Sequence, residues 1–126
     1  MKIYLKLVLL ILIVFLVTSC ESFAKKTFFY ANLDFNTRLS TKSPIYYGGV
    51  IIGRVTEILV LIEEKEKRIK FFIFEDYRTI AREGTKIIFK IDNDNIVKWI
   101  DISPDIDFKN SDMLPEEGYF ISIMEP

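Results

Sequence analysis

The sequence has no histidine and only one cysteine, Cys20. The commonest general base, most zinc and haem sites and any intramolecular disulfide are therefore excluded. The chain has 17 basic and 18 acidic residues, so neither sign of charge is in clear excess. No long block of like charge occurs. A nucleic-acid footprint needs such a block, so the composition argues against nucleic acid as a partner.

Apolar side chains are plentiful in this chain. They make up 50% of the 126 residues, and 14% of all residues are aromatic. A disordered chain carries far fewer, and a chain of this length forms one domain rather than two. We therefore expect a single domain that folds around a packed core.

The first twenty residues have the pattern of a targeting segment. Lys2 and Lys6 precede an uninterrupted apolar run, Leu7 to Val17, which leads into Thr18, Ser19 and Cys20. This pattern resembles a bacterial lipoprotein signal with the lipobox VTSC. The resemblance implies that a diacylglyceryl group alkylates the Cys20 thiol, that the chain is cut before it and that the new amino group is acylated.

The alternative interpretation of this segment is a membrane-spanning helix with an incidental cysteine. From Leu7 to Cys20 such a helix rises only about 21 Å, against a hydrocarbon core of roughly 30 Å. We therefore expect a signal peptide at 1–19, a lipidated anchor and short linker at 20–27, and a folded domain at 28–126. The domain would be held at a membrane surface of the bacterial envelope and face the periplasm or exterior.

Alternation of apolar and polar residues predicts an all-β domain. The segment Glu75–Gly84 reads as one or two helical turns or a wide connection, and Ile96–Ile102 as a possible further strand. Regular turn signals favour a small barrel or sandwich. The six clear strands are expected at Thr27–Phe35, Ile45–Tyr47, Val50–Ile62, Ile69–Phe74, Thr85–Ile91 and Tyr119–Met124.

Three of the five glycines fall in one short β-branched and aromatic run, IYYGGVIIGRV from Ile45 to Val55. Glycine weakens a strand interior, so Gly48, Gly49 and Gly53 are expected where φ is positive or where a side chain does not fit. Gly48 and Gly49 should turn the chain. Gly53, inside the following strand, predicts a bend or bulge that helps to close a barrel.

This run, with Thr56 to Ile58 after it, resembles the signature of the mammalian cell entry (MCE) domain. That signature has an apolar residue, two variable or aromatic positions, a glycine, an apolar trio, a second glycine and a valine. Phe35 and Leu39 match the family's upstream phenylalanine and leucine, and the resemblance extends over Phe28 to Met124. The matching positions are Ile45, Tyr47, Gly49, Val50, Ile52, Gly53 and Val55, with Gly48 inside the same run.

The resemblance implies a seven-stranded barrel that assembles into rings, usually hexamers, around an apolar pore. Such rings carry phospholipids or other hydrophobic molecules between membranes, commonly with the permease and ATPase of an ABC transporter. Each lipid methylene that is exposed to water costs about 0.8 kcal/mol, and an apolar path removes this cost. No chemistry is required, so the expected protein is not an enzyme and needs no cofactor and no metal.

In the MCE family a loop before the last strand carries two pore-lining leucines between glycines. The corresponding segment here is NSDMLPEEGYF, in which only Met113 and Leu114 resemble the pair and Gly118 the following glycine. The resemblance therefore assigns Met113 and Leu114 to the pore. The alternative is that both are ordinary core or loop-anchoring residues.

Other kinds of site have less support in the sequence. Asp92 and Asp94 are spaced like calcium-loop carboxylates, but the required glycine and glutamate are missing and turn residues explain them better. A hydrolase that uses a carboxylate pair has no further feature in its favour. The remaining rival to lipid transport is a surface or envelope-scaffold lipoprotein that binds a protein partner.

Overall fold

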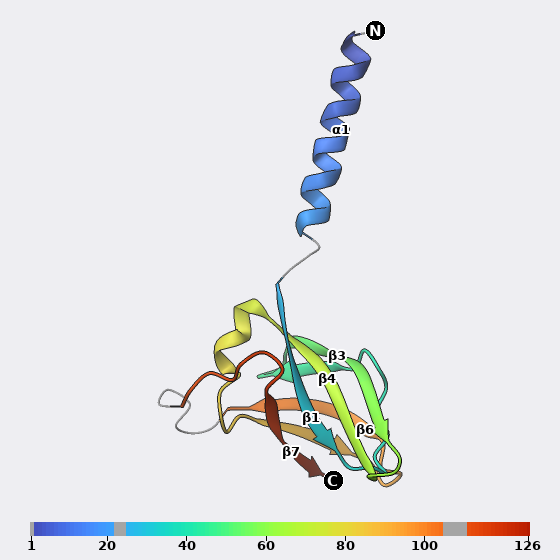
Figure 1. Ribbon diagram of the computed structural model, residues 1–126, viewed down its shortest axis with the longest axis vertical. Helices are drawn as coiled ribbons and strands as arrows, with labels where there is room; N and C mark the ends of the chain where they lie inside the picture. The colour runs from blue at the N-terminus through green and yellow to red at the C-terminus, as the bar shows by residue number, and fades with distance from the viewer. Residues whose placement is uncertain (1, 22–24, 105–110) are drawn as a thin grey trace.

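A computed structural model describes residues 2–21, 25–104 and 111–126, with side chains from 14 to 21 left out. Figure 1 shows one helix standing away from a small β-barrel. The elements in chain order are α1 (Lys2–Glu21), β1 (Lys26–Leu33), β2 (Pro44–Tyr47), β3 (Val50–Leu61), β4 (Glu66–Phe74), the 3-10 helix η1 (Glu75–Ile80), β5 (Lys86–Ile91), β6 (Val97–Ser103) and β7 (Tyr119–Glu125).

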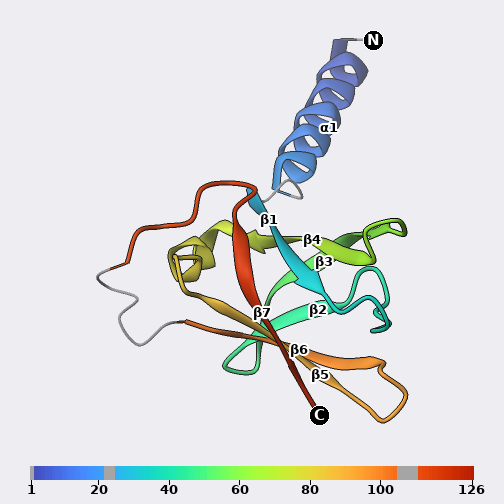
Figure 2. The same ribbon diagram turned by 60° about the horizontal axis from the view of Figure 1, so that its bottom comes forward.

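The strands close into a barrel in the order β1-β4-β3-β2-β6-β5-β7. Antiparallel ladders join β1 to β4, β4 to β3, β3 to β2 and β5 to β6. The barrel is completed by parallel pairing of β7 with both β1 and β5, and of β2 with β6. Figure 2 shows how β7 passes between the β1 and β5 sides of the wall. Each strand thus has a neighbour on both sides, and closure of this kind is the usual protection of a small β domain against edge-to-edge association.

Two of the parallel pairings are very short and lie beneath stacked rings. β2 meets β6 only at Tyr46 and Asp101, and the rings of Tyr46 and Trp99 stack there with centroids 3.8 Å apart. β1 meets β7 at two residue pairs, where the rings of Tyr30 and Tyr119 stack with centroids 5.5 Å apart. Aromatic pairs contribute about 0.5–1.5 kcal/mol beyond their burial, so each stack strengthens a seam that has few backbone bonds.

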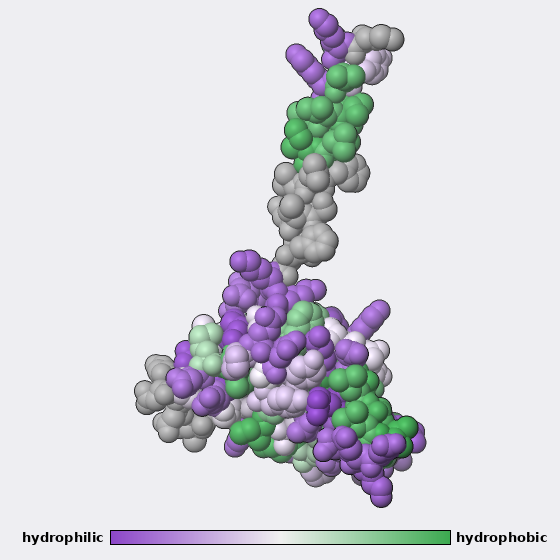
Figure 3. All heavy atoms as spheres, viewed as in Figure 1, coloured by the Kyte–Doolittle hydropathy of each residue, from purple (hydrophilic) through white to green (hydrophobic). Residues whose placement is uncertain are grey.

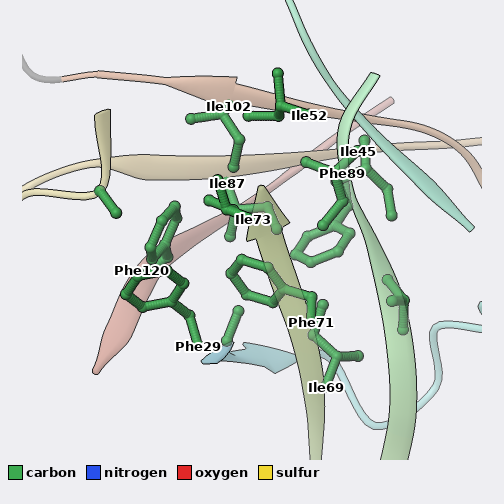
Figure 4. Packing of buried hydrophobic residues seen from close by; sticks show 14 of the residues in the cluster. Phe29, Ile45, Ile52, Ile69, Phe71, Ile73, Ile87, Phe89, Ile102 and Phe120 are labelled. Carbon is green, nitrogen blue, oxygen red and sulfur yellow. The ribbon is translucent and has the colours of Figure 1, made fainter. Parts of the chain in front are cut away.

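The interior of the barrel is filled by side chains (Figure 4). Inward-pointing residues come from all seven strands, and Phe29, Phe71 and Phe89 are fully buried among isoleucines and Val55. Phe120 of β7 packs against Phe29 and Phe71, with ring centroids 5.2 and 5.1 Å away. Each such side chain contributes about 1.5–3 kcal/mol by leaving water. The described side chains therefore fill the barrel with a packed core.

The expected all-β, seven-stranded barrel is confirmed, and the possible strand Ile96–Ile102 is β6. Two boundaries differ from the sequence prediction by more than one residue. β4 begins at Glu66, three residues before the predicted start at Ile69, because Glu66 to Arg68 extend the ladder with the end of β3. β1 ends at Leu33, so Phe35 lies in the following turn rather than on the inward face.

Candidate functional site

The apolar residues of the glycine-rich run divide between the core and the surface. Ile45, Ile52 and Val55 are fully buried, whereas Tyr47 and Val50 flank the turn and are exposed. The buried three come from the two strands that the run forms, and they pack against the barrel's central cluster. Most of the family-like pattern therefore serves the fold, and of its matching apolar positions Tyr47 and Val50 are the exposed ones.

The β2–β3 turn depends on the backbone freedom of its two glycines. Gly48 has φ +58° and Gly49 has φ +84°, and no heavy atom lies within 4 Å of where a Cβ would stand on either residue. Positive φ in two successive residues is typical of tight two-residue hairpin turns whose twist matches the flanking strands. Glycine is therefore required here for conformation and not for space.

Gly53 has the opposite requirement. A Cβ at this position would overlap the carbonyl oxygen of Phe72 and lie 3.2 Å from Cα of Ile73, so the β4 backbone occupies the place of a side chain. The ladder irregularities predicted for Gly53 lie on either side of it. Ile52 is the extra residue against β2, and Thr56 is the extra residue against β4. Gly53 thus lets two strands approach closely between two bulges.

The two residues assigned to the pore are separated by the fold. Leu114 is 9% exposed and belongs to the hydrophobic core cluster, while its neighbour Met113 is 43% exposed. The Leu114 amide donates to the carbonyl oxygen of Ala81 at 2.9 Å, which fixes this part of the chain against the end of η1. Of the two residues Met113 is the exposed one, and the pore role of the pair stays a prediction.

Two arginines that are not among the site residues expected from the sequence hold residues 111–114 in place. Arg78 and Arg82 lie within and just after η1, and each donates a hydrogen bond to a backbone carbonyl of residues 111–114. They are four residues apart in EDYRTIAREG, a spacing that sequence alone reads as one face of a helix. Nothing local in the sequence marks their partners, because those lie about thirty residues further along the chain.

Asp92 acts as a turn residue. Its carboxylate accepts hydrogen bonds from the backbone N–H groups of Asp94 and Ile96, at 2.9 and 3.0 Å, and Lys98 Nζ lies 3.4 Å away. The bond from Ile96 is the main reason why the pKa of Asp92 lies below its usual value of 3.8. Within the described ranges, no three histidine, cysteine, aspartate or glutamate side chains gather closely enough to hold a metal ion.

Cys20 falls near the end of α1, and its side chain is outside the part that the structure describes. Lipidation, cleavage before Cys20 and the proposed domain boundaries therefore stay predictions. In the described portion of the chain, no helix combines the length and apolarity needed to cross a bilayer.

An apolar patch lies on the barrel surface at the far end of β3. Val60 is 47% exposed and Ile62, in the turn that follows, is 75% exposed. They line a shallow cavity of about 270 Å³ together with Leu61, Glu63 and Glu64. Figure 3 shows this patch in green at the end of the barrel away from α1. Exposed apolar patches of this kind are typical of interaction sites.

Comparison with known proteins gives a structural relationship without a sequence relationship. No family model and no curated protein matches the sequence. Among solved structures, one chain of the "Acinetobacter MlaFEDB complex in ATP-bound Vtrans1 conformation" superposes with a TM-score of 0.60 and 11% sequence identity. The match covers 97% of this chain and 92% of that one, so it extends beyond the barrel into α1. This protein therefore shares its fold with a chain of that complex.

Proposed function

We propose that this protein is an MCE-domain lipoprotein that binds phospholipid or another hydrophobic ligand as an extracytoplasmic subunit of an ABC-type transport system. The observation that carries the proposal is the position of the glycine-rich run. It forms a β2–β3 hairpin in a closed barrel whose fold matches a chain of the Acinetobacter MlaFEDB complex. That complex is described as ATP-bound, in keeping with a partner ATPase and permease for this chain.

The packed interior supports assembly into a ring. Since the barrel core is filled by residues such as Phe29 and Phe71, one copy offers no internal tunnel for an acyl chain. Several copies arranged around an axis would enclose a path between them, and exposed apolar side chains such as Met113 would line it. An apolar lining would lower the cost of moving lipid by about 0.8 kcal/mol for each buried methylene.

Lipid binding is tested on the full chain, expressed in a bacterial envelope and purified in mild detergent. Solvent extraction and mass spectrometry should find phospholipid in stoichiometric amount, and light scattering should find a ring. The variant Met113→Ser should hold less lipid with an unchanged melting temperature, whereas Met113→Leu keeps an apolar side chain and should hold as much as wild type. A lipid-free monomer would contradict the proposal.

The lipid anchor has its own test. Mass spectrometry of the membrane-bound protein should show a mature chain that begins at Cys20 and carries diacylglyceryl and acyl groups. The variant Cys20→Ser should keep residues 1–19 and lack the lipid mass. If the wild-type chain also keeps residues 1–19, the lipoprotein assignment is wrong while the barrel's lipid binding is unaffected by that result.

A surface or envelope-scaffold lipoprotein that binds a protein partner is the second candidate function. The apolar patch of Val60 and Ile62 supports it, because the patch lies at the barrel end away from α1 (Figure 3). Affinity purification of the full chain after cross-linking in cells separates the two candidates. Recovery of a permease and an ATPase supports transport, and recovery of other envelope proteins that Ile62→Ser abolishes supports the scaffold.

A further inference from the structure

Arg78 connects the segment before β7 to the barrel core. Its Nη1 donates to the Ala81 carbonyl oxygen at 3.2 Å, and its Nη2 donates to the carbonyl oxygen of Leu114. Its guanidinium carbon lies 5.0 Å from the ring centroid of Phe29, a fully buried core residue. One half-buried cation thus contacts the core, the end of η1 and the segment before β7 at the same time.

Arg82 makes a second connection to the same segment. Its Nε donates to the carbonyl oxygen of Thr79 at 3.0 Å, and its Nη1 donates to the carbonyl oxygen of Ser111 at 2.7 Å. The backbone of Arg82 forms an antiparallel bridge with Met113, which places their two side chains on one face. The arginine is therefore the direct neighbour of the exposed methionine.

Backbone hydrogen bonds also hold residues 111–114 against the chain that follows η1. The Glu83 amide donates to the Asp112 carbonyl oxygen and the Leu114 amide donates to the Ala81 carbonyl oxygen, both at 2.9 Å. Residues 78–83 thus supply donors to three of the four carbonyls in residues 111–114. A short non-repetitive segment held by so many bonds has one position relative to the barrel.

Both positions need the geometry of arginine. A guanidinium is planar, always charged and able to bond two acceptors in fixed directions, which a lysine ammonium on its flexible stem does not reproduce. In Arg78 and Arg82 one acceptor belongs to the η1 region and the other to residues 111–114. Each side chain therefore links two segments of the chain in a fixed geometry, and we call this pair of hydrogen bonds a bracket.

We propose that Arg78 and Arg82 are positioning residues that seat residues 111–114 on the barrel and so set where the Met113 side chain is presented to lipid. The inference rests on the proposed lipid-binding function, because it takes Met113 as a contact for the ligand. It also explains what places Met113 at the surface. The hydrogen bonds of Arg78 and Arg82 hold the segment from both ends, and Leu114 is buried in the core beside the methionine.

Hydrogen exchange on the purified full chain measures the seating directly. In Arg82→Gln the bracket to Ser111 is lost, and amides in residues 111–114 should exchange about tenfold faster, the change expected from losing a charge-assisted hydrogen bond. Arg82→Lys, which keeps the charge but not the fork, should fall between the variant and wild type. Unchanged exchange in Arg82→Gln would overturn the proposal.

The matched control is Arg54→Gln. Arg54 also donates from its guanidinium to a loop carbonyl, that of Lys42 at 3.1 Å, but the loop is the one that precedes β2. This variant should leave the exchange of residues 111–114 and the amount of bound lipid as in wild type. If it accelerated exchange in that segment as much as Arg82→Gln did, the effect would be general loosening and the proposal would fail.

Bound lipid per chain supplies the functional measurement. Arg82→Gln should lose lipid to about the same degree as Met113→Ser, and Arg82→Lys should retain part of it. Faster exchange with full lipid content would overturn the positioning role. A wild-type chain without lipid would instead overturn the proposed function, and the exchange data would still decide whether the arginines seat the segment.

Discussion

The β2–β3 turn and residues 111–114 are both short pieces of irregular chain fixed to the barrel wall, and different forces fix them. The turn is set by the positive φ of Gly48 and Gly49 and by the strands on either side. The segment before β7 is set by donors from Arg78 and Arg82, far away in sequence. The Asp92 turn is a local version of the second kind, because a side chain bonds nearby backbone. The conformation of the glycine turn therefore depends on neighbouring residues, whereas the hydrogen bonds of Arg78 and Arg82 to residues 111–114 depend on the whole fold.

The largest expected effect comes from filling the space at Gly53. Gly53→Val would push a side chain into the Phe72 carbonyl, and neither backbone can move without breaking the β3–β4 ladder. We expect a loss of about 3 kcal/mol or more in the free energy of unfolding, measured by thermal and denaturant melts. The control Ile51→Val introduces the same residue on an exposed part of β3 and should change stability by less than about 0.5 kcal/mol. Equal melting temperatures would show that the strands do not approach as described.

The next effect separates Leu114 from Met113. Leu114→Ala removes a buried side chain from the core cluster and should cost about 2–4 kcal/mol. Met113→Ala, one residue earlier and exposed, should stay within about 0.5 kcal/mol of wild type. Comparable losses from the two variants, measured by chemical denaturation, would contradict the inside and outside placement of this pair.

A smaller effect tests whether the β2–β3 turn needs glycine for conformation alone. Gly49→Ala should cost about 1 kcal/mol, because a residue with a Cβ is strained at φ +84°. Since no atom lies within 4 Å of the added Cβ, Gly49→Leu should cost about the same as alanine. A much larger loss with leucine in thermal melts would mean that space, and not backbone conformation, selects glycine there.

The smallest effect concerns the Asp92 turn and depends on pH. The folded state lowers the pKa of Asp92, mainly through the Ile96 amide, so the carboxylate stabilises the fold above its unfolded-state pKa. This contribution is lost as the pH falls through the lowered folded-state value. Asp92→Asn should therefore melt slightly earlier than wild type at pH 7 and equally in strong acid. A difference that persists unchanged in acid would rule out the carboxylate as its source.

Much of the barrel could be predicted from sequence because its causes are local. Alternation placed β1, β2, β3, β5 and β7 within a few residues of their observed bounds. The special role of Gly48, Gly49 and Gly53 follows from glycine's rarity in strands. For the candidate site, the sequence predicts that Tyr47 and Val50 flank a turn. It does not predict how exposed the two side chains are, since a turn's position does not say how far it extends beyond the barrel wall.

The sequence by itself determined the strand pattern, the glycine turn and the apolar face that forms the core, because each depends on neighbouring residues and period. Only the tertiary structure decided that Leu114 turns inward while Met113 stays exposed, since two adjacent apolar residues carry no periodic signal. It also decided the partners of Arg78 and Arg82. Those bonds span 36 and 29 residues, and their ends meet only when the parallel pairing of β7 with β1 and β5 closes the barrel.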